Sequence, residues 1–273
     1  MAVAVRGETS TDAELGIMEG YKPESYGNGI ADVYDRWYAD ISDISSTVAH
    51  LAAITGSGHA LELGIGSGRI AVPLSDAGTS VWGVDASPAM VELLRSWAPL
   101  LADRTWLGDM SALGLPPKFP IVFETIFVTF NTFCNVTTKL GQQNCLTRCR
   151  ELLAPGGRLV VESFVPAEIS DVERSVTVKS LELDRVVLTV SIADPVAQSI
   201  TGQHVEFTES GGVKLRPFVL RYLSPSDLDD MAMAAGLTLH ARHEDWTGTP
   251  FTANSGVHVS TYVAPYDETY EPL

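Results

Sequence analysis

The sequence predicts an α/β fold whose main sheet is mostly parallel. From His59 onward, short apolar runs alternate with helical patterns, and this alternation is typical of strand–helix–strand crossovers. The apolar runs are residues 60–63, 81–84, 121–130 and 159–161. A glycine-rich turn after the first run and an acidic residue at the end of the second support the prediction, because such sheets bind ligands at their carboxyl edge.

The composition is that of a folded, acidic protein. The chain has 273 residues, 45% of them hydrophobic, which is enough for one or two domains. The net charge of −16 argues against a nucleic-acid partner, because binding to phosphate backbones needs clustered Lys and Arg. No apolar run reaches the ~18 residues that a membrane span needs, and the first residues lack a secretory pattern. We therefore expect no membrane partner and a cytoplasmic protein.

Cysteine and histidine spacing predicts neither a disulfide framework nor a metal site. The chain has an odd number of cysteines, which is typical of free thiols in a reducing compartment. His240 and His243 lie three residues apart on a predicted strand, so they face opposite sides and cannot chelate one ion.

The first 20 or so residues are polar and lack an apolar period, and residues 21–29 include two tyrosines and two glycines. We expect residues 1–29 to form a mobile lid that closes when ligands are bound, and Tyr21, Glu24 and Tyr26 are its candidate catalytic residues. The alternative is a plain surface lead-in to the fold.

Helices are predicted from apolar spacing and from their first residues. Apolar residues recur every three or four positions from Ile30 to Leu51, which predicts one helix with a break near Ser42. Two later helices are expected to begin at Ser87-Pro88 and Ser224-Pro225, with serine as the N-cap and proline as the first helical residue.

Residues 172–223 have a different pattern from the rest of the chain. Apolar and polar residues alternate there between turn signals, which predicts antiparallel strands inserted after the last parallel strand. Alternation places His204 and Glu206 on one face. If that face lines a cavity, His204 is a candidate general base; the alternative is a surface histidine. Residues 237–263 are expected to complete the main sheet as a hairpin, before a tail at 264–273.

Three glycines at every second position follow the first strand. Gly64, Gly66 and Gly68 let the backbone approach a ligand closely and direct free N–H groups toward it, although tight structural turns also use glycine. The dinucleotide fingerprint requires its third glycine at position 69, where Arg69 stands. The sequence therefore disfavours NAD as the ligand.

Carboxylates follow the next two strands. Asp85 ends the second strand, where it can accept hydrogen bonds from the two hydroxyls of a ribose. Asp109 ends the third strand, where it can accept from an adenine amino group beside the apolar Met110. Phe130 and Asn131 end the fourth strand below the same crevice. Together these strand ends predict a nucleoside site.

These motifs resemble those of the class I S-adenosylmethionine-dependent methyltransferases. The matching segments are residues 62–68, 85–90, 108–110 and 152–159, and the resemblance spans roughly residues 26–263. It implies a Rossmann-like sheet of seven strands with an antiparallel last strand, a methyltransferase domain over residues 30–263 and S-adenosylmethionine as the cofactor. It also implies that Glu62 supports the glycine loop. Arg69 could reach the cofactor carboxylate; the alternative is an exposed arginine at the start of the following helix. The cofactor-binding residues are expected to be Glu62, Gly64, Gly66, Gly68, Arg69, Asp85, Ala86, Met90, Asp109, Met110, Phe130 and Asn131.

Resemblance within the family indicates a small-molecule acceptor. Residues 130–133 lack the motif of the branch that methylates nucleic-acid amino groups. The N-terminal helix and the insert resemble natural-product tailoring enzymes, and the indole C3-methyltransferases of physostigmine-type pathways in particular. We expect methylation of an aromatic carbon in secondary metabolism, with His204 accepting the proton; N-methylation of an amino sugar and O-methylation are alternatives.

Two other classes of function are left open, an NAD-dependent oxidoreductase and a non-catalytic nucleoside-binding domain. A homodimer is a further expectation.

Overall fold

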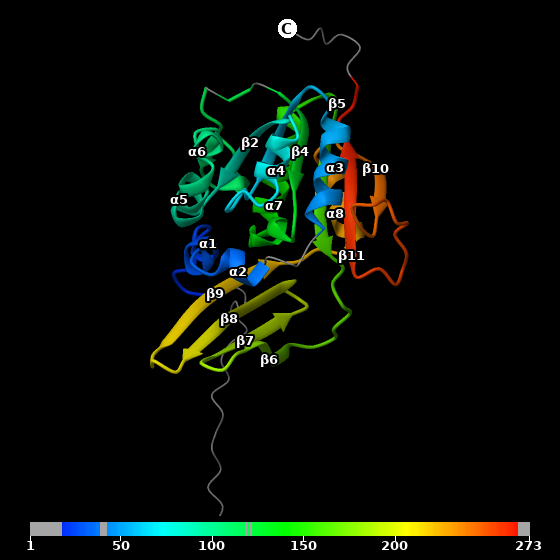
Figure 1. Ribbon diagram of the computed structural model, residues 1–273. Coiled ribbons are helices and arrows are strands. Elements are labelled where there is room, and N and C mark those ends of the chain that lie inside the picture. The colour runs from blue at the N-terminus through cyan, green and yellow to red at the C-terminus, as the bar shows by residue number, and fades with distance from the viewer. Residues whose placement is uncertain (1–17, 39–42, 118, 121, 267–273) are drawn as a thin grey trace, which may run out of the picture.

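The computed structural model describes residues 18–38, 43–117, 119–120 and 122–266, which form two sheets (Figure 1). Sheet A has seven strands in the order β10-β11-β5-β4-β1-β2-β3. Their bounds are β1 (His59–Leu63), β2 (Ser80–Asp85), β3 (Thr105–Leu107), β4 (Phe123–Val128), β5 (Leu153–Phe164), β10 (Thr238–His243) and β11 (Val257–Val263). Strands β1 to β5 pair in parallel, and β11 is antiparallel to both β5 and β10. The predicted sheet is confirmed.

Helices cover both faces of sheet A. One layer consists of α3 (Ile44–Thr55), α4 (Ala71–Asp76), α5 (Pro88–Trp97) and α6 (Pro99–Ala102), and the other of α7 (Lys139–Leu152) and α8 (Pro225–Ala234). Two short 3₁₀ helices, η1 (Met110–Ala112) and η2 (Thr132–Asn135), follow β3 and β4. None of the helices in the described ranges combines the length and the apolar character that crossing a membrane requires.

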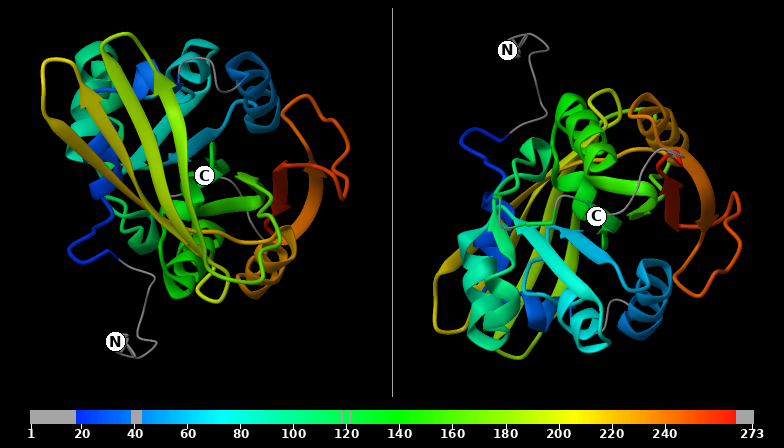
Figure 2. Two further views of the ribbon diagram at one scale, coloured as in Figure 1. Left: turned by 90° about the horizontal axis from the view of Figure 1, so that it is seen from below. Right: turned by 90° about the horizontal axis from the view of Figure 1, so that it is seen from above.

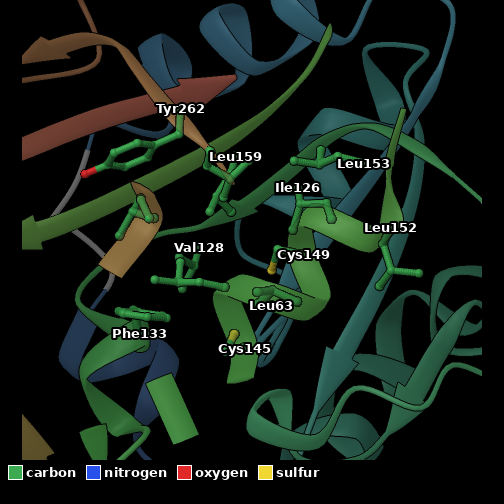
Figure 3. Packing of buried hydrophobic residues seen from close by; sticks show 14 of the residues in the cluster. Leu63, Ile126, Val128, Phe133, Cys145, Cys149, Leu152, Leu153, Leu159 and Tyr262 are labelled. Atoms are coloured by element: carbon green, nitrogen blue, oxygen red, sulfur yellow. The ribbon is translucent and has the colours of Figure 1, made fainter. Parts of the chain in front are cut away.

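The core follows from the alternation of side chains along the central strands. Leu61 and Leu63 of β1 face α7 and α8, whereas Ala60 faces the layer of α3 to α6. Cys145 and Cys149 of α7 are buried free thiols beside Leu63 (Figure 3). Truncating a fully buried leucine such as Leu63 to alanine is expected to cost about 2–5 kcal/mol.

Sheet B is the predicted insert, an antiparallel meander between β5 and α8. Its strands are β6 (Glu173–Leu181), β7 (Arg185–Asp194), β8 (Ser199–Thr208) and β9 (Val213–Arg221), paired in that order. Sheet B lies across the carboxyl edge of the parallel strands, with α1 (Ser25–Ile30) and α2 (Tyr34–Tyr38) between the two sheets (Figures 1 and 2). The face toward α1 and α2 is the polar one, and there His204 and Glu206 are buried.

The helix predicted from Ile30 to Leu51, with a break near Ser42, is wrong in its first part, because Ile30 ends α1 and a turn separates it from α2. The chain turns at residues 31–33, and α3 begins separately at Ile44. The apolar residues belong to two cores, because Ile30 packs with Met90 above α5 whereas Leu51 packs on sheet A. The predicted break at Ser42 lies outside the described residues, as do 1–17 of the predicted lid and 267–273 of the predicted tail.

The two Ser-Pro helix starts are confirmed. Ser87 accepts a hydrogen bond from the backbone N–H of Met90 at the start of α5. Ser224 and Asp227 form a capping box at the start of α8. The Ser87 cap also fixes the point where α5 faces the glycine loop.

Candidate functional site

The glycine loop needs glycine for two different reasons. All three glycines have positive φ, at +71° for Gly64, +56° for Gly66 and +84° for Gly68. A Cβ on Gly64 would lie 2.3 Å from Cγ2 of Thr132, so this glycine is also required for close packing. A Cβ on Gly66 would approach nothing closer than 4.0 Å. The loop is therefore packed at Gly64 and leaves open space at Gly66.

Asp85 stands at the end of β2, against this loop. Its Oδ2 accepts the N–H of Gly66 at 2.8 Å, and its Oδ1 accepts the N–H of Ser87 at 2.8 Å. Burial raises the pKa of Asp85. Each oxygen retains further accepting capacity toward a cavity of about 70 Å³, which we call the nucleoside cavity. Its lining includes Gly64, Gly66, Asp85, Ala86, Met90 and Met110.

Glu62 is a fully buried carboxyl beneath the loop. Burial raises its pKa well above the usual range, and its hydrogen bond with the backbone of Ala71 opposes that rise. Oε2 of Glu62 has no hydrogen-bond partner among the described residues. Glu62 therefore lies beneath the loop as a buried carboxyl and does not line the nucleoside cavity.

Arg69 does not line the nucleoside cavity. Its guanidinium lies over the ring of Phe130, 4.5 Å from the ring centroid, and its Nη1 donates to the carbonyl of Tyr38 at 3.4 Å. Gly68 packs against Leu94 and is likewise absent from the cavity lining. Neither residue lines the nucleoside cavity, so the cavity lining does not support the cofactor contacts expected of them.

A second cavity of about 200 Å³ adjoins the first on the side of β3. Asp109 lines it and caps η1, accepting from N and Oγ of Ser111 at 2.8 and 2.7 Å. Tyr21 belongs to this cavity, and burial raises its pKa to about 12. Pro23 and Asn135 line both this cavity and the nucleoside cavity, so the two are contiguous.

A third cavity of about 270 Å³, the aromatic cavity, lies between η2 and the inner face of sheet B. It is lined by Tyr26, Tyr34, Tyr38, Phe130, Asn131, Thr132, Asn135, His204, Phe218 and Leu220. Tyr26, Tyr34 and Asn135 also line the nucleoside cavity, so a ligand there can face one in the aromatic cavity. Oδ1 of Asn135 is buried without a hydrogen-bond partner among the described residues.

The turn that follows β4 has a strained backbone and lines the aromatic cavity. Phe130 and Asn131 have φ of +56° and +63°, a conformation that non-glycine residues rarely adopt. The N–H of Phe130 donates to Oε2 of Glu162, and Oδ1 of Asn131 accepts from the N–H of Phe164, both at 2.7 Å. This turn places Phe130 and Asn131 in the aromatic cavity, whereas the sequence assigned them to the cofactor.

The tyrosine hydroxyls of the aromatic cavity stay protonated at neutral pH. Burial raises the pKa of Tyr26 well above its usual range and that of Tyr34 to about 12. The hydroxyls of Tyr26 and Tyr38 lie 3.1 Å apart and share a hydrogen bond. These groups can orient an acceptor, but they are poor bases.

His204 is a weaker base than its sequence context indicated. Its ring lies between those of Trp37 and Phe218, and Nδ1 is 2.9 Å from Oγ1 of Thr189. Burial, with positive charge from Lys179 and Arg216, lowers its pKa to about 4. His204 is therefore neutral at pH 7 but accepts a proton poorly.

Glu206 and Glu24, the two carboxylates that the sequence offers beside His204, do not line the aromatic cavity. Glu206 is on the same face, but its Oε2 accepts from Arg216 at 2.7 Å. Glu24 precedes α1 and lines none of the three cavities.

Sequence reasoning missed several lining residues. Tyr34 and Tyr38 lie one helical turn apart on α2, and this spacing was a usable signal. The sequence holds no signal for Thr132 and Asn135. These residues reach the site because the strained turn at Phe130 brings η2 there.

Known proteins share both the domain and the full architecture. The profile of a methyltransferase domain family matches residues 60–157. The CcbJ methyltransferase from Streptomyces caelestis is 37% identical, with 90% of this chain and 100% of that chain covered and a TM-score of 0.81. The cypemycin N-terminal methyltransferase from a Streptomyces species is 27% identical over 244 residues, which are 85% of this chain and 95% of that enzyme.

Two further similarities are weaker, one in the length matched and the other in sequence identity. The demethylmenaquinone methyltransferase of Tropheryma whipplei strain Twist is 30% identical over 142 residues, and the chain spans only 56% of its length. CalS10 from Micromonospora echinaspora, an amino pentose methyltransferase solved with S-adenosylmethionine bound, shares the fold at 20% identity, with a TM-score of 0.61 and 85% of this chain and 94% of that chain covered.

The residues at the glycine loop fit S-adenosylmethionine. Open space at Gly66 admits a ligand and Asp85 has accepting capacity for a ribose, whereas Glu62 is buried beneath the loop and lines none of the three cavities. The relative from S. caelestis is covered over its whole length, so the likeness includes sheet B as well as sheet A. This chain belongs to the class I S-adenosylmethionine-dependent methyltransferases, and S-adenosylmethionine is its cofactor.

Proposed function

We propose that this chain methylates an amine nitrogen of a small natural-product intermediate bound in the aromatic cavity. The supporting observation is the lack of a strong base. Among the described residues that line this cavity none is a carboxylate, and the pKa of His204 is about 4. When bound, the cofactor supplies an electrophilic methyl group on its sulfonium. An amine brings its own lone pair, whereas a phenol or an indole must lose a proton as it attacks.

The cavity walls suit an amine in two ways. The rings of Tyr26, Tyr34 and Phe130 exclude water, and a water-poor site favours the neutral, nucleophilic form of the amine. The same ring faces can stabilise the positive charge that forms on nitrogen as the new bond is made. The unpaired Oδ1 of Asn135 can accept one N–H and so orient the lone pair toward the nucleoside cavity.

One relative supports a nitrogen acceptor by its name. The name of the cypemycin N-terminal methyltransferase refers to an N-terminus, and an N-terminal amino group is an amine. Methylation of an indole carbon is the second candidate, and the aromatic walls favour it. In that reaction His204, helped by Tyr21, Glu24 or Tyr26, would accept the proton, a role that its low pKa disfavours.

The segment before α2 acts as a lid in this proposal. Pro23, Tyr26 and Gly27 line the nucleoside cavity, which has a volume of about 70 Å³. Asn28 holds the segment down, because its Oδ1 accepts from Oγ of Ser87 at 2.8 Å. Opening of α1 would admit the cofactor, and closing would exclude water before transfer.

The enzyme is also proposed to be a homodimer. The outer face of sheet B exposes apolar side chains, including Val176, Val178, Val213 and Leu215. A contiguous exposed apolar face of this kind marks an interaction surface. Isologous pairing of two such faces would bury them.

An acceptor screen tests the proposed reaction. Wild-type enzyme and His204→Ala are incubated with methyl-labelled cofactor and with matched amines, indoles and phenols. We expect labelled N-methyl products, and turnover in His204→Ala within about threefold of wild type. A catalytic base contributes about 10²- to 10⁴-fold. Methylation confined to indoles or phenols, or a loss of that size in a variant that still binds cofactor, would overturn the proposal.

A further inference from the structure

A further pocket, lined mostly by polar and charged residues, lies between the start of α2 and strands β7, β8 and β9 of sheet B. Its volume is about 380 Å³, and the turn between β8 and β9 forms part of its rim. Its charged lining residues are Asp32, Arg36, Arg185, Glu206, Lys214 and Arg216. Four cations therefore face two carboxylates in a chain whose net charge is −16. We call this site the arginine pocket.

Arg216 is the paired, structural member of the group. Its side chain is 1% exposed, and its guanidinium donates to Asp32, to the carbonyl of Gly29 and to Glu206 at 2.5 to 2.7 Å. Lys214 adds a second contact with Asp32 at 2.6 Å. These bonds use both carboxylates to fix β9 against the segment before α2.

Arg185 and Arg36 are left without a carboxylate of their own. Both approach the same Oε1 of Glu206, Arg185 with Nε at 3.1 Å and Arg36 with Nη2 at 3.7 Å. Among the described residues, none accepts a hydrogen bond from either side chain. The Arg185 side chain is only 21% exposed, so water solvates its charge incompletely. Three guanidinium groups thus share the carboxylate of Glu206, and the four cations of the pocket outnumber its two carboxylates.

We propose that the arginine pocket binds an oxyanion, a carboxylate or a phosphate, through Arg185 and Arg36. Guanidinium groups bind such anions with two parallel N–H···O bonds. An anion in the pocket neutralises the surplus charge beside Glu206. Gly211 and Gly212 leave the rim free of side chains, and a Cβ on either would meet nothing within 4 Å.

The pocket adjoins the aromatic cavity on the same face of sheet B. His204 and Arg216 are direct partners in the register of β8 and β9. Glu206 follows His204 by two residues on β8, a rise of about 7 Å. The oxyanion can therefore be the far end of an acceptor or a separate small molecule.

Calorimetric titration with inorganic phosphate and with succinate at low ionic strength tests the site without any methyl transfer. The variants are Arg185→Gln and Arg36→Gln. The second keeps the test valid if the first is unstable, because the Arg36 side chain is 49% exposed. The matched control is Arg95→Gln, which removes one positive charge from an exposed pair with Glu92 on α5.

We expect saturable binding of at least one anion by the wild type and by Arg95→Gln, and about tenfold or more weaker binding by each pocket variant. Absence of saturable binding by the wild type would overturn the proposal. Equal affinities in all variants, meaning an adventitious ion only, would overturn it as well.

A second arm, which rests on the proposed function, identifies the source of the oxyanion. Amines with and without a distant carboxylate are compared as acceptors for wild type and Arg36→Gln. If the acceptor carries the oxyanion, the wild type prefers the carboxylate-bearing amine and the variant loses the preference. If the oxyanion is a separate molecule, Arg36→Gln loses phosphate or succinate binding and its acceptor preference is unchanged. Either result supports an oxyanion site.

Discussion

Asp85 has accepting capacity left for a ribose beyond its bonds with Gly66 and Ser87. We predict that Asp85→Asn weakens S-adenosylmethionine binding about 10²-fold, because hydrogen bonds from two hydroxyls to a charged group are worth about 1.5–3 kcal/mol each. Asp76→Asn at the exposed end of α4 is the control. Calorimetry gives the dissociation constants and thermal unfolding checks the fold. A folded variant with an unchanged constant would remove Asp85 from the cofactor site.

His204 and His258 are both buried as neutral rings, and burial lowers the pKa of each to about 4. Their unfolded pKa is about 6.5, so the unfolded chain binds more protons below that pH. The free energy of unfolding is therefore greatest above pH 6.5 and falls as the pH drops toward 4. We predict a loss of about 2 kcal/mol per histidine between pH 7 and pH 5.

Urea unfolding at the two pH values measures this loss. His204→Gln should remove its share of the pH dependence, whereas His240→Gln, at an exposed position on β10, should leave the dependence intact. An identical pH dependence in His204→Gln and wild type would show that His204 is not held neutral.

Helix α1 can close only because Gly27 has no side chain. A Cβ at this position would lie 2.5 Å from Cβ of Ser87 and 3.2 Å from Cγ of Met90. We predict that Gly27→Ala raises KM for the cofactor about tenfold, because α1 can no longer settle on α5. Gly29→Ala is the matched control, since its Cβ has ordinary contacts of 3.7 Å with Pro217. Steady-state kinetics measure KM for the cofactor in both variants. Equal KM values would contradict the proposal that α1 closes as a lid.

Local signals explain which elements the sequence predicted. The glycine loop, Asp85 and the Ser87 cap each follow from a few neighbouring residues. The left-handed turn at Phe130 and Asn131 has no such signature, because Glu162 and Phe164 of another strand hold it in place. From the sequence pattern alone, Phe130 and Asn131 are expected beside the cofactor, whereas in the structure they line the aromatic cavity.

At the scale of the whole molecule, alternation predicted sheet B but not its environment. The polar face points inward, where Arg216 pairs with Asp32 across 184 residues. This pairing depends on how sheet B docks against α1 and α2, which no local pattern reports. The apolar face is consequently left exposed.

The exposed apolar face leads to a prediction about assembly. Val178→Lys combined with Leu215→Lys should convert a dimer into a monomer, because lysines would be buried opposite each other in the interface. Val196→Lys, in the turn between β7 and β8, is the control. Light scattering after size exclusion measures the mass. A monomeric wild type, or a double variant that stays dimeric, would contradict the proposed assembly.

Cofactor binding is the most direct test, because the proposed roles of the glycine loop, the strand-end carboxylates and the adjoining cavities all depend on S-adenosylmethionine. Calorimetry with the wild-type chain should show saturable binding of S-adenosylmethionine and of its demethylated product, and no binding of NAD. Binding of NAD without binding of S-adenosylmethionine would contradict the account.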